Sequence, residues 1–471
     1  MRWPRVRERW HDGRMIRVPS TPLFEGAARV CDALRAAGHR ALWAGGCVRD
    51  LLMGRPGKDV DIATSATPDE VLALFPDGKA VGRAFGVVRV IRGEATYEVA
   101  TFRSDAAYSD GRRPDSVTFT DERTDALRRD FTINALFFDP VSGDVLDYAG
   151  GRADLDARVI RCVGDPAARF HEDHLRLLRA VRFASVLEFD IERATADAIR
   201  REAPHVRKIS AERVRIELTR LFVESPRPGA GLRLLRDLDV LKQVLPEVAA
   251  LEGCRQPPEY HGELDVLQHT EAALDAMGPG GDPNVAWALL LHDIGKPGTA
   301  SVETRADGRT RIRFSGHAAL GAQMAEKVLR RLKFSNEDRE TIARCVDEHT
   351  RFFNVPNMRR STLLQWAAKP WMDTLLEVHR LDRLAGHRRL DEYQLVRKVR
   401  EELQRLASLP RPLVDGRVLM RAGVAAGPAM KPILAEIYNL QLEHPEWTRA
   451  DLLRAWRAEG EGRDRRSMTG A

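Results

Sequence analysis

Hydrophobic and polar residues follow two different patterns along the chain. Four segments near the N-terminus show the short apolar runs or the alternation typical of strands: 41–44, 58–64, 87–91 and 96–102. The last two are close enough to form a hairpin across residues 92–95. From residue 125 onward the apolar positions recur at the helical period of ~3.6 residues. We therefore predict an α+β fold, with a small mixed sheet first and an all-α remainder.

Composition narrows the class of protein without identifying a function. With 43% hydrophobic and 31% charged residues, the 471-residue chain is typical of a globular protein and not of a disordered or collagen-like one. No stretch approaches the roughly 18 unbroken apolar residues of a membrane span, and the N-terminus lacks the apolar core of a secretory signal. Five widely separated cysteines indicate a reducing, cytoplasmic environment. The net charge of +6 permits a nucleic-acid partner, but binding needs a local basic face.

A glycine pair and two carboxylates carry the first candidate chemistry. Gly45 and Gly46 lead from a strand into a helix, where backbone N–H groups can meet a phosphate and Arg49 can add a charge-assisted bond. The alternative for the glycines is an ordinary tight turn. Asp59 and Asp61 are two apart on a predicted strand, so both project from one face. Two such carboxylates are costly side by side unless a cation lies between them, and Mg²⁺ suits them.

Glu98, on the predicted hairpin, is a third candidate carboxylate if its strand neighbours that of the aspartates. The alternative for all three acidic residues is a solvated edge.

Several motifs in the same order resemble those of one family. GGCVRD with KDVDIAT, RRDFTINAL, DYAGGRADLDARVIR, EDHLRLLRAVRF and ERVRIE are similar to the motifs of the class II nucleotidyltransferases. That family comprises CCA-adding tRNA nucleotidyltransferases and bacterial poly(A) polymerases. The resemblance implies a polymerase-β-like head with Asp59, Asp61 and Glu98 as catalytic residues, holding Mg²⁺ at the two aspartates.

Asp173 and Arg176 form a candidate base-reading pair. Cytosine and adenine each present an amino donor beside a ring-nitrogen acceptor, whereas uracil and guanine present the reversed pattern. A carboxylate beside a guanidinium therefore admits C and A and leaves unpaired groups with U and G. On one helix the two residues are i, i+3 neighbours, so a simple ion pair is the alternative. The resemblance implies that they act as an amino-acid template.

Further arginines are expected around the triphosphate. Arg179 and Arg182 continue the i+3 series, and Arg129 belongs to the RRD block. Guanidinium groups suit phosphate oxygens, although a solvated basic stripe would have the same spacing. Asp130 is expected to brace these arginines or to cap the helix predicted over FTINAL, and not to touch substrate.

A second metal site is predicted further along. His269, His292, Asp293 and Asp347 combine imidazole and carboxylate ligands, and an adjacent His-Asp pair after an apolar helix needs buried partners. Any one histidine alone could be a hydrogen-bonded core residue. The pattern resembles the HD phosphohydrolase superfamily, with Lys296 in HDIGKP fitting it. His317 and His349 are weaker candidates for the same site. The metal is divalent, and its identity is left open.

These motifs divide the chain into domains. The predicted order is an N-terminal extension (1–22, with Met15 an alternative start), the nucleotidyltransferase head (23–150), neck and body helices (151–255), the HD domain (256–369), a tRNA-binding tail (370–458) and a disordered end (459–471). The tail is assigned by resemblance: LVDGRVLMRAGVAAGPAMKPILAEIYNLQLE resembles the tail of the HD-bearing tRNA nucleotidyltransferases. The resemblance implies that its arginines and lysines contact tRNA phosphates without reading bases, and an ordinary solvated helical face is the alternative.

The predicted function is CCA addition to tRNA from CTP and ATP, with Mg²⁺ at the head and an HD phosphohydrolase activity in addition. No membrane and no protein partner are expected. Within the class, the alternatives are a poly(A) polymerase or an enzyme that adds only CC or only A; the DGRRPD loop at 110–115 argues against the CC-only form. Outside it, the alternatives are an HD phosphohydrolase with an inactive head and a non-enzymatic RNA-binding protein.

Overall fold

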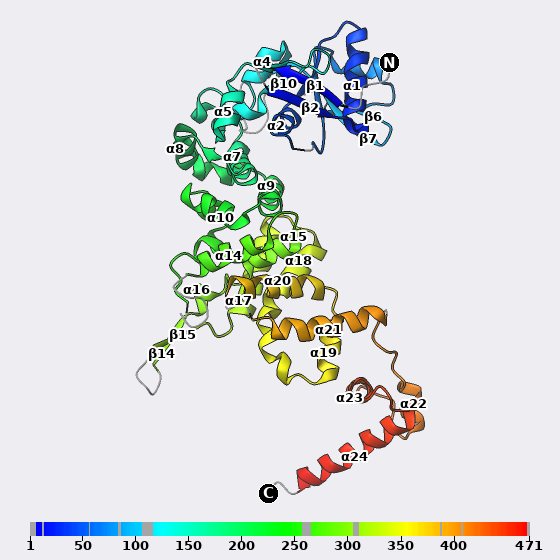
Figure 1. The fold of residues 1–471 in the computed structure, drawn as a ribbon. Coiled ribbons are helices and arrows are strands. Elements are labelled where there is room, and N and C mark those ends of the chain that lie inside the picture. The colour runs from blue at the N-terminus through cyan, green and yellow to red at the C-terminus, as the bar shows by residue number, and fades with distance from the viewer. Residues whose placement is uncertain are drawn as a thin grey trace. The chain divides into compact units, whose positions relative to one another are not determined.

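A computed structural model describes the chain as two compact units (Figure 1). The first contains residues 1–249 and 278–280, and the second contains 250–277 and 281–471. The described residues are 6–11, 14–55, 57–82, 86–105, 116–256, 265–304, 310–386, 389–406 and 408–468. The loop at 110–115, on which one prediction depends, lies outside them.

The first unit begins with a mixed sheet. Its seven strands run in the order β11-β10-β3-β4-β7-β6-β5. Their bounds are Ala41–Ala44 (β3), Asp61–Thr64 (β4), Lys79–Gly82 (β5), Val87–Arg92 (β6), Ala95–Thr101 (β7), Leu136–Phe138 (β10) and Val145–Asp147 (β11). Every pairing is antiparallel except that of β4 with β7. The predicted hairpin is β6 and β7, and the small mixed sheet is confirmed.

Two smaller strand pairs accompany the sheet. They are β1 with β2 (Val6–His11 and Arg14–Pro19) and β8 with β9 (Arg103–Asp105 and Val117–Phe119).

Apolar side chains cover both faces of the sheet. In β3, Trp43 packs into the larger core together with α1, while Leu42 and Ala44 point into a second cluster on the opposite face. The helices around the sheet are α1 (Pro22–Ala36), α2 (Gly46–Leu52), α3 (Pro68–Leu74), α4 (Glu122–Leu127), the short 3-10 helix η2 (Thr132–Asn134) and α5 (Gly151–Ala157). Double-sided burial explains why the 41–44 segment is a continuous apolar run.

The helix predicted over FTINAL is wrong. Residues 132–134 form only a 3-10 turn, and 136–138 form strand β10, which pairs with both β3 and β11. A period-based prediction cannot separate a short buried strand from a buried helical segment, and here pairing along the sheet decides.

Helices make up most of the rest of the first unit. They are α6 (Pro166–Glu172), α7 (Leu175–Leu187), α8 (Arg193–Glu202), η3 (Ala203–Lys208), α9 (Ala211–Glu224), α10 (Pro228–Asp237), α11 (Leu241–Val244) and α12 (Pro246–Ala249). The all-α prediction needs one correction here, because β12 (Val159–Ile160) pairs in parallel with β13 (Asp190–Ile191).

The second unit is built around a buried helix. Every residue of α15 from Val285 to Leu291 is buried, and α15 packs against α14, α18 and α20. The elements are α14 (Val266–Met277), α15 (Pro283–Leu291), α16 (Lys296–Thr299), α17 (His317–Arg331), α18 (Asn336–Glu348), η4 (His349–Asn357), α19 (Arg360–Ala367), α20 (Met372–Ala385) and α21 (Asp391–Arg405). The hairpin of β14 (Ser301–Thr304) and β15 (Thr310–Arg313) is a second departure from the all-α prediction.

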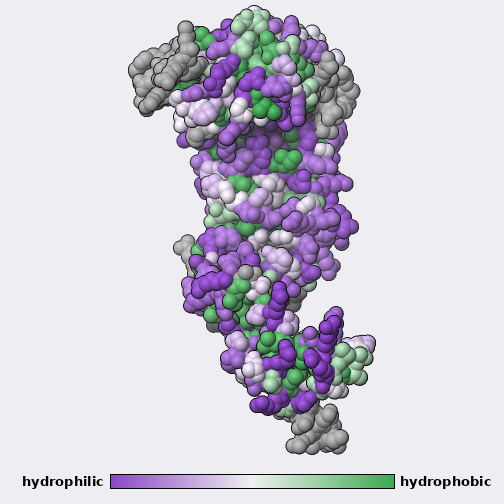
Figure 2. Space-filling model, turned by 90° about the vertical axis from the view of Figure 1, so that its right-hand side faces the viewer, coloured by the Kyte–Doolittle hydropathy of each residue, from purple (hydrophilic) through white to green (hydrophobic). Residues whose placement is uncertain are grey.

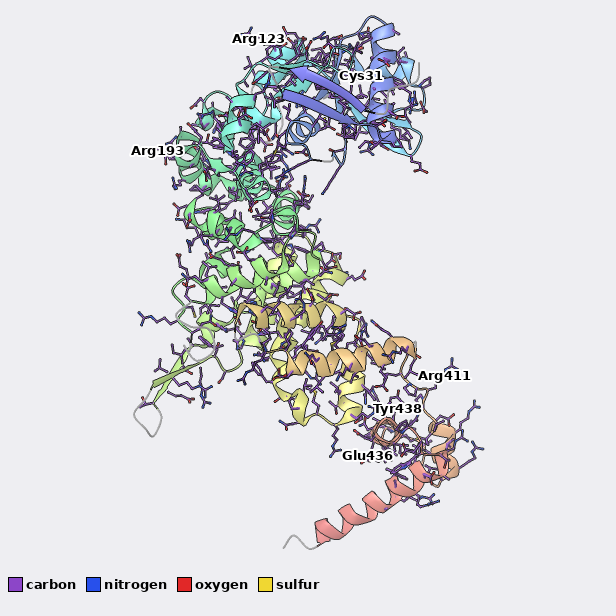
Figure 3. All side chains as sticks on the ribbon, in the orientation of Figure 1. Cys31, Arg123, Arg193, Arg411, Glu436 and Tyr438 are labelled. Carbon is purple, nitrogen blue, oxygen red and sulfur yellow. The ribbon has the colours of Figure 1, made fainter. Side chains whose placement is uncertain are left out.

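The C-terminal helices have a small core of their own. They are α22 (Gly416–Arg421), α23 (Met430–Glu443) and α24 (Arg449–Met468). On α23, the Tyr438 hydroxyl donates to the Pro410 carbonyl at 2.8 Å and Gln441 Nε2 donates to the Arg411 carbonyl at 2.9 Å (Figure 3). Both bonds tie the preceding extended segment to the helix.

Two boundaries predicted from the sequence change. The helix α20 packs among α14, α15 and α18, so the compact core of the second unit extends past residue 369. The helix α24 continues to Met468, where a disordered end was predicted from 459. Glutamate and arginine in that segment favour helix and outweigh its two glycines.

The described helices include none long and apolar enough to cross a membrane. On the face drawn in Figure 2, hydrophobic side chains are scattered among hydrophilic ones.

Candidate functional sites

The glycine turn of the first unit has the backbone that only glycine adopts readily. Gly45, between β3 and α2, has φ +73°, and a Cβ there would lie 3.0 Å from Nη1 of Arg129. The Gly45 N–H donates to the Leu136 carbonyl at 3.0 Å, which fixes the turn against β10. Glycine at position 45 therefore leaves room for the Arg129 guanidinium group.

Asp59 and Asp61 project from the sheet as predicted. Val60 and Ile62 are buried and the two aspartates are exposed, although regular strand begins only at Asp61. Desolvation first, then the charges of Asp59 and Glu98, raise the pKa of Asp61 to about 6. The carboxyl reaches solvent, so we attribute this desolvation to the partly enclosed space around it. Like charges held together in this way favour a bound cation.

The third carboxylate, Glu98, is a neighbour of Asp61. The parallel register pairs Ile62 with Val99, which sets Glu98 beside Asp61 one position earlier. Glu98 also lies 3.7 Å from Arg89, between Oε1 and Nη2. Among the described residues, these three carboxylates do not form a set with ligand atoms all within 4.8 Å of one another. Mg²⁺ often takes one or two carboxylates and completes its shell with substrate phosphates and water, so Asp59 and Asp61 fit it.

One pocket of about 890 Å³ joins the head to the helices that follow. The predicted site residues that line it are Gly46, Arg49, Asp59, Asp61, Arg129, Asp173, Arg176, Arg179 and Arg182. Glu98, although described, is outside this lining. Residues from the sheet and from α7, more than a hundred positions apart in sequence, thus face the same space.

Carboxylates hold the pocket arginines in place. Arg179 pairs with Asp130, with Nε–Oδ2 at 2.8 Å and Nη2–Oδ2 at 2.7 Å. Burial alone would raise the pKa of Asp130, but the charges of Arg179 and Arg176 outweigh it and lower the pKa to about 2. Asn134 Nδ2 also donates to Asp130, at 3.2 Å. Asp130 therefore holds Arg179 in place, as predicted.

Three further polar residues were not singled out in the sequence. Buried Asp125 accepts from Arg129 Nε and Nη2 at 3.2 and 3.0 Å. Buried Glu217 accepts from Arg182 Nε at 2.6 Å, and Asn134 Oδ1 accepts from Arg49 Nη1 at 2.8 Å. The i, i+4 spacing of Asp125 and Arg129 was a local signal for the first pair. No local signal exists for the other two.

Asp173 and Arg176 do not share one helix, which corrects the sequence prediction. Helix α6 ends at Glu172, Asp173 is extended (φ −141°, ψ 104°), and α7 starts at Leu175. The Asp173 carboxylate accepts from the Leu175 N–H at 3.0 Å, two residues on, because a short acidic side chain competes with helix by bonding nearby backbone.

Each member of this pair is positioned by another charged residue. Arg213 donates to both carboxylate oxygens of Asp173, at 2.8 and 3.2 Å. Arg176 Nη1 lies 2.5 Å from Glu172 Oε2 and 3.0 Å from the Arg169 carbonyl. Both side chains line the pocket and are pre-oriented there.

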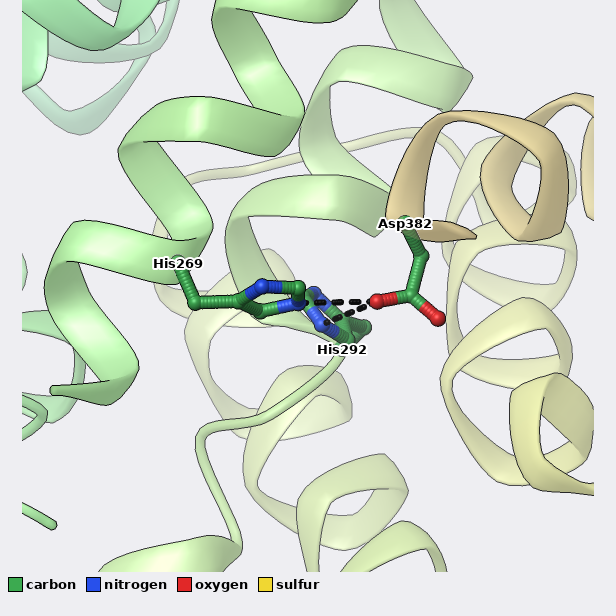
Figure 4. A group of neighbouring side chains, drawn as sticks. All are labelled: His269, His292 and Asp382. Carbon is green, nitrogen blue, oxygen red and sulfur yellow. Dashed lines mark hydrogen bonds and ion pairs between the residues drawn. The ribbon is translucent and has the colours of Figure 1, made fainter. Parts of the chain in front are cut away.

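In the second unit, histidines and aspartates form two adjoining clusters. Within each cluster, the ligand atoms all lie within 4.8 Å of one another. The clusters are His269, His292 and Asp382, and Asp293, His317 and His349. In the first, His269 Nε2 lies 2.8 Å and His292 Nε2 3.7 Å from Asp382 Oδ1 (Figure 4). The three residues come from α14, the end of α15 and α20.

The second cluster shares a carboxylate with the first. Asp293 Oδ1 lies 3.5 Å from His317 Nε2 and 3.8 Å from His349 Nε2, while its Oδ2 lies 3.0 Å from His292 Nε2. Asp293 therefore has one oxygen facing each cluster. A divalent metal, if bound, would find carboxylate and imidazole ligands in either cluster.

Backbone carbonyls orient three of the histidines. Nδ1 of His292, His317 and His349 each lies 2.7 Å from the carbonyl three residues earlier. This contact places the proton on Nδ1 and leaves Nε2 available to a metal. Burial first, then the charge of His292, lowers the pKa of His349 to about 4, which keeps it neutral.

Among the described residues, Asp347 belongs to neither cluster, and Asp382, which was not predicted, lies in the first. Two positions on a helix differ by about 200°, so Asp347 projects away from the cluster that His349 enters. Asp382 lies on α20 three positions after His379, and it is not part of a His-Asp pair adjacent in sequence, which was the signal used at His292. Lys296 Nζ lies 2.7 Å from Asp293 Oδ2, as its place in the motif suggested.

Comparisons with known proteins match three parts of the chain to family models. Residues 41–161 match the poly A polymerase head domain family, 188–251 the probable RNA and SrmB-binding site of polymerase A, and 264–397 the HD domain. A CCA-adding enzyme from Lactobacillus delbrueckii subsp. bulgaricus is 47% identical over 284 residues, 60% of this chain and 67% of the relative. One from Geobacillus thermodenitrificans is 45% identical over 276 residues, 58% of this chain and 64% of the relative.

Solved structures extend the likeness to almost the whole chain. The Bacillus stearothermophilus CCA-adding enzyme in complex with CTP has a TM-score of 0.73 at 28% identity, covering 95% of this chain and 100% of that one. The Thermotoga maritima CCA-adding enzyme complexed with tRNA shares the fold, with a TM-score of 0.58 at 19% identity over 93% of this chain and 96% of that one. The sequence matches span 50–67% of the curated relatives' length. The chain belongs to the CCA-adding enzyme family.

Proposed function

We propose that this protein adds C, C and A to the 3′ end of tRNA from CTP and ATP, without a nucleic-acid template. One observation carries the proposal: the Asp59–Asp61 pair, the braced arginines and the Asp173–Arg176 pair all line one pocket. A pocket that only bound RNA would need no adjacent carboxylates. The similar Bacillus stearothermophilus enzyme, which forms a complex with CTP, supports a nucleotide at this place.

The reaction makes one phosphodiester bond and releases pyrophosphate. The 3′-hydroxyl oxygen of tRNA attacks the α-phosphorus, the bond from that phosphorus to the β-phosphate oxygen breaks, and the hydroxyl proton passes to solvent. Mg²⁺, which Asp59 and Asp61 would hold, activates the hydroxyl and neutralises the leaving pyrophosphate when bound. Arg49, Arg129 and Arg179 bind and orient the triphosphate with their guanidinium groups.

Base choice follows from the orientation of Asp173 and Arg176. The carboxylate accepts from the amino group of cytosine or adenine, and the guanidinium donates to the neighbouring ring nitrogen. Uracil or guanine would leave a buried donor and acceptor unpaired, which can cost several orders of magnitude in selectivity. Arg213 and Glu172 hold the two side chains before the base arrives.

The test measures selectivity and product together. The protein is incubated with tRNA ending at the discriminator base, Mg²⁺ and each labelled NTP, and the 3′ end is read. We expect C, C and A in order, and Asp173→Ala to lose discrimination against UTP and GTP. The matched control Asp190→Ala removes an exposed aspartate of the same unit. Unchanged selectivity of Asp173→Ala would refute the template assignment.

The same assay separates the alternatives within the class. Tails of A without a requirement for CC would identify a poly(A) polymerase, and products that stop at CC or begin from CC would identify the partial enzymes. The HD domain and the tail that resembles those of HD-bearing tRNA nucleotidyltransferases argue against the polymerase.

A second activity, hydrolysis of phosphate esters by the second unit, is favoured by the two adjoining ligand clusters. A water oxygen would attack phosphorus, the ester P–O bond would break, and the leaving alcohol would take the proton. His269, His292 and Asp382 would hold one divalent metal, and Asp293, His317 and His349 a second. When bound, such metals lower the pKa of water and polarise the phosphate.

Metal content tests this second activity apart from the first. Dialysed protein is reloaded with Mn²⁺, and bound metal and hydrolysis of glycerol 2-phosphate are measured. We expect about two metals per chain and hydrolysis, with His349→Asn losing one metal. Absence of both binding and hydrolysis would leave the clusters as a hydrogen-bonded core.

We also propose a cytoplasmic location. Four of the five free cysteines are buried and the fifth is half-buried, which fits a reducing cytoplasm. The partners that the proposed activity requires are tRNA, CTP and ATP.

A further inference from the structure

Phe183 is the only aromatic side chain among the described residues that line the pocket of the first unit. It lies on α7 directly after Arg182 and is 8% exposed. The proposed function uses the carboxylates and arginines of this pocket and leaves the ring without a role. The charged groups around the ring indicate what it does there.

Three guanidinium groups lie around the Phe183 ring. The guanidinium carbon is 4.1 Å from the ring centroid in Arg182, 5.2 Å in Arg179 and 5.3 Å in Arg49. All three distances are within the roughly 6 Å over which an aromatic ring attracts a cation. Arg49 belongs to α2, whereas Arg179 and Arg182 belong to α7. One ring thus contacts cations from two separate elements.

The partners described above hold these arginines one at a time. Each guanidinium has a bond of 2.6–2.8 Å to a different acceptor, on Asn134, Asp130 or Glu217. The ring of Phe183 is a contact that all three arginines share. Because an aromatic face attracts every cation near it, the shared ring also offsets part of the repulsion among three like charges.

The ring itself is held in place. Phe131 packs against it in a T-shaped contact, with ring centroids 5.8 Å apart and an interplanar angle of 79°. Phe131 is fully buried, and its N–H donates to the Asp130 carboxylate at 2.8 Å. Asp130 is in turn the partner of Arg179. The ring and the carboxylate that act on Arg179 are therefore fixed by the same residue.

We infer that Phe183 is a positioning residue for the triphosphate. Its ring sets the relative places of Arg49, Arg179 and Arg182, and these guanidinium groups bind the phosphates. This inference rests on the proposed nucleotidyl transfer and adds a residue to it. The ring acts on the phosphate end of the nucleotide only, because a separate carboxylate–guanidinium pair reads the base.

Removing the ring should weaken phosphate binding without abolishing it. Arg129, a further arginine proposed to bind the triphosphate, lies over a different ring, with its guanidinium carbon 4.8 Å from the centroid of Phe137. The acceptors that hold the other three arginines also stay in place. The expected effect is therefore a partial loss of nucleotide affinity with base selectivity kept.

The experiment measures nucleotide affinity and base selectivity separately. Binding of labelled CTP to the full chain is measured by equilibrium dialysis with Mg²⁺ and without tRNA, so that no transfer occurs. Phe183→Leu keeps an apolar side chain but loses the aromatic face, and it should weaken CTP binding about tenfold. Phe183→Tyr keeps the face and should bind CTP within about threefold of the wild-type protein. The ratio of kcat/KM for CTP and UTP should be the same in all three proteins.

A matched control removes an aromatic ring elsewhere in the same unit. Phe189 is 6% exposed and is outside the described lining of the pocket. Phe189→Leu should bind CTP as the wild-type protein does.

Each outcome decides the inference. CTP binding by Phe183→Leu at the wild-type level overturns it, and so does an equal loss in Phe183→Tyr or in the Phe189→Leu control. A loss of selectivity against UTP in Phe183→Leu also overturns a role confined to the phosphates. If the wild-type protein binds CTP but transfers no nucleotide to tRNA, the proposed function fails while the dialysis still tests Phe183. Absence of CTP binding by the wild-type protein overturns both.

Discussion

Replacing Asp130 by asparagine removes the charge that anchors Arg179. The carboxyl is 10% exposed, and its pKa lies near 2 instead of the ordinary 3.8. The pKa of Asp130 is thus lowered by about 1.8, and each pKa unit is worth about 1.36 kcal/mol. The shift corresponds to about 2 kcal/mol of folding free energy at neutral pH. Asparagine retains a hydrogen-bond acceptor, so the expected loss for Asp130→Asn is about 1–2 kcal/mol.

The sign of the pH dependence follows from the direction of the shift. Because the folded-state pKa of Asp130 is below the unfolded value, its stabilisation is complete above about pH 4–5 and disappears as pH falls through about 2. The difference between wild-type and Asp130→Asn proteins should therefore be constant from pH 7 to pH 5. It should shrink to about half near pH 3.

Hydrogen exchange measures this loss locally. Unfolding of a chain with two units need not be two-state, so peptides covering α7 and residues 128–136 report the opening free energy where Asp130 acts. The control Asp190→Asn removes an exposed carboxyl from the same unit and should stay within about 0.5 kcal/mol of wild type. A loss in Asp130→Asn no larger than the control's would refute the anchoring role.

Three further substitutions test other parts of the chain. Asp61→Asn should reduce CCA addition on the order of a thousandfold, because a metal ligand is lost, while Mn²⁺ binding by the second unit persists; addition at the wild-type rate would exclude Asp61 from catalysis. Arg213→Gln should weaken discrimination against UTP about tenfold by releasing Asp173, whereas Arg193→Gln, at a side chain 96% exposed, should not; equal selectivity in both variants contradicts the bracing. Gly295→Ala would place a Cβ 2.1 Å from the His317 carbonyl oxygen, so the second unit should melt at lower temperature and bind less metal; a wild-type melting curve argues against this close contact.

Local patterns were sufficient for two features of the head, the aspartate pair and the hairpin. The alternation of Val60 and Ile62 with Asp59 and Asp61 placed both carboxylates on one face, and the structure keeps that arrangement although the strand is shorter than predicted. The hairpin of β6 and β7 was equally local. Strand β7 runs beside β4 and so brings Glu98 to Asp61. This neighbourhood depends on the order of strands in the sheet, which no local pattern determines.

Contacts between distant segments explain most of what was missed. Asp382 enters the metal cluster from a helix 89 positions after Asp293, and its own neighbourhood is an ordinary amphipathic pattern. Glu217 meets Arg182 across 35 positions. Asp347 was preferred because it stood near a histidine in sequence, yet helical geometry turns the two in different directions.

The arrangement of charge explains why the net value of +6 carried so little information. Arg129, Arg179 and Arg182 are each matched by a buried or nearly buried carboxylate in the first unit. The pairing leaves little excess charge to appear in the total, yet it fixes each guanidinium where a triphosphate would meet it. An unpaired arginine would keep its full charge but lose its orientation, and a pocket of mobile cations would bind phosphates without aligning them for in-line displacement. A small net charge is therefore consistent with a site whose arginines are held in fixed orientations.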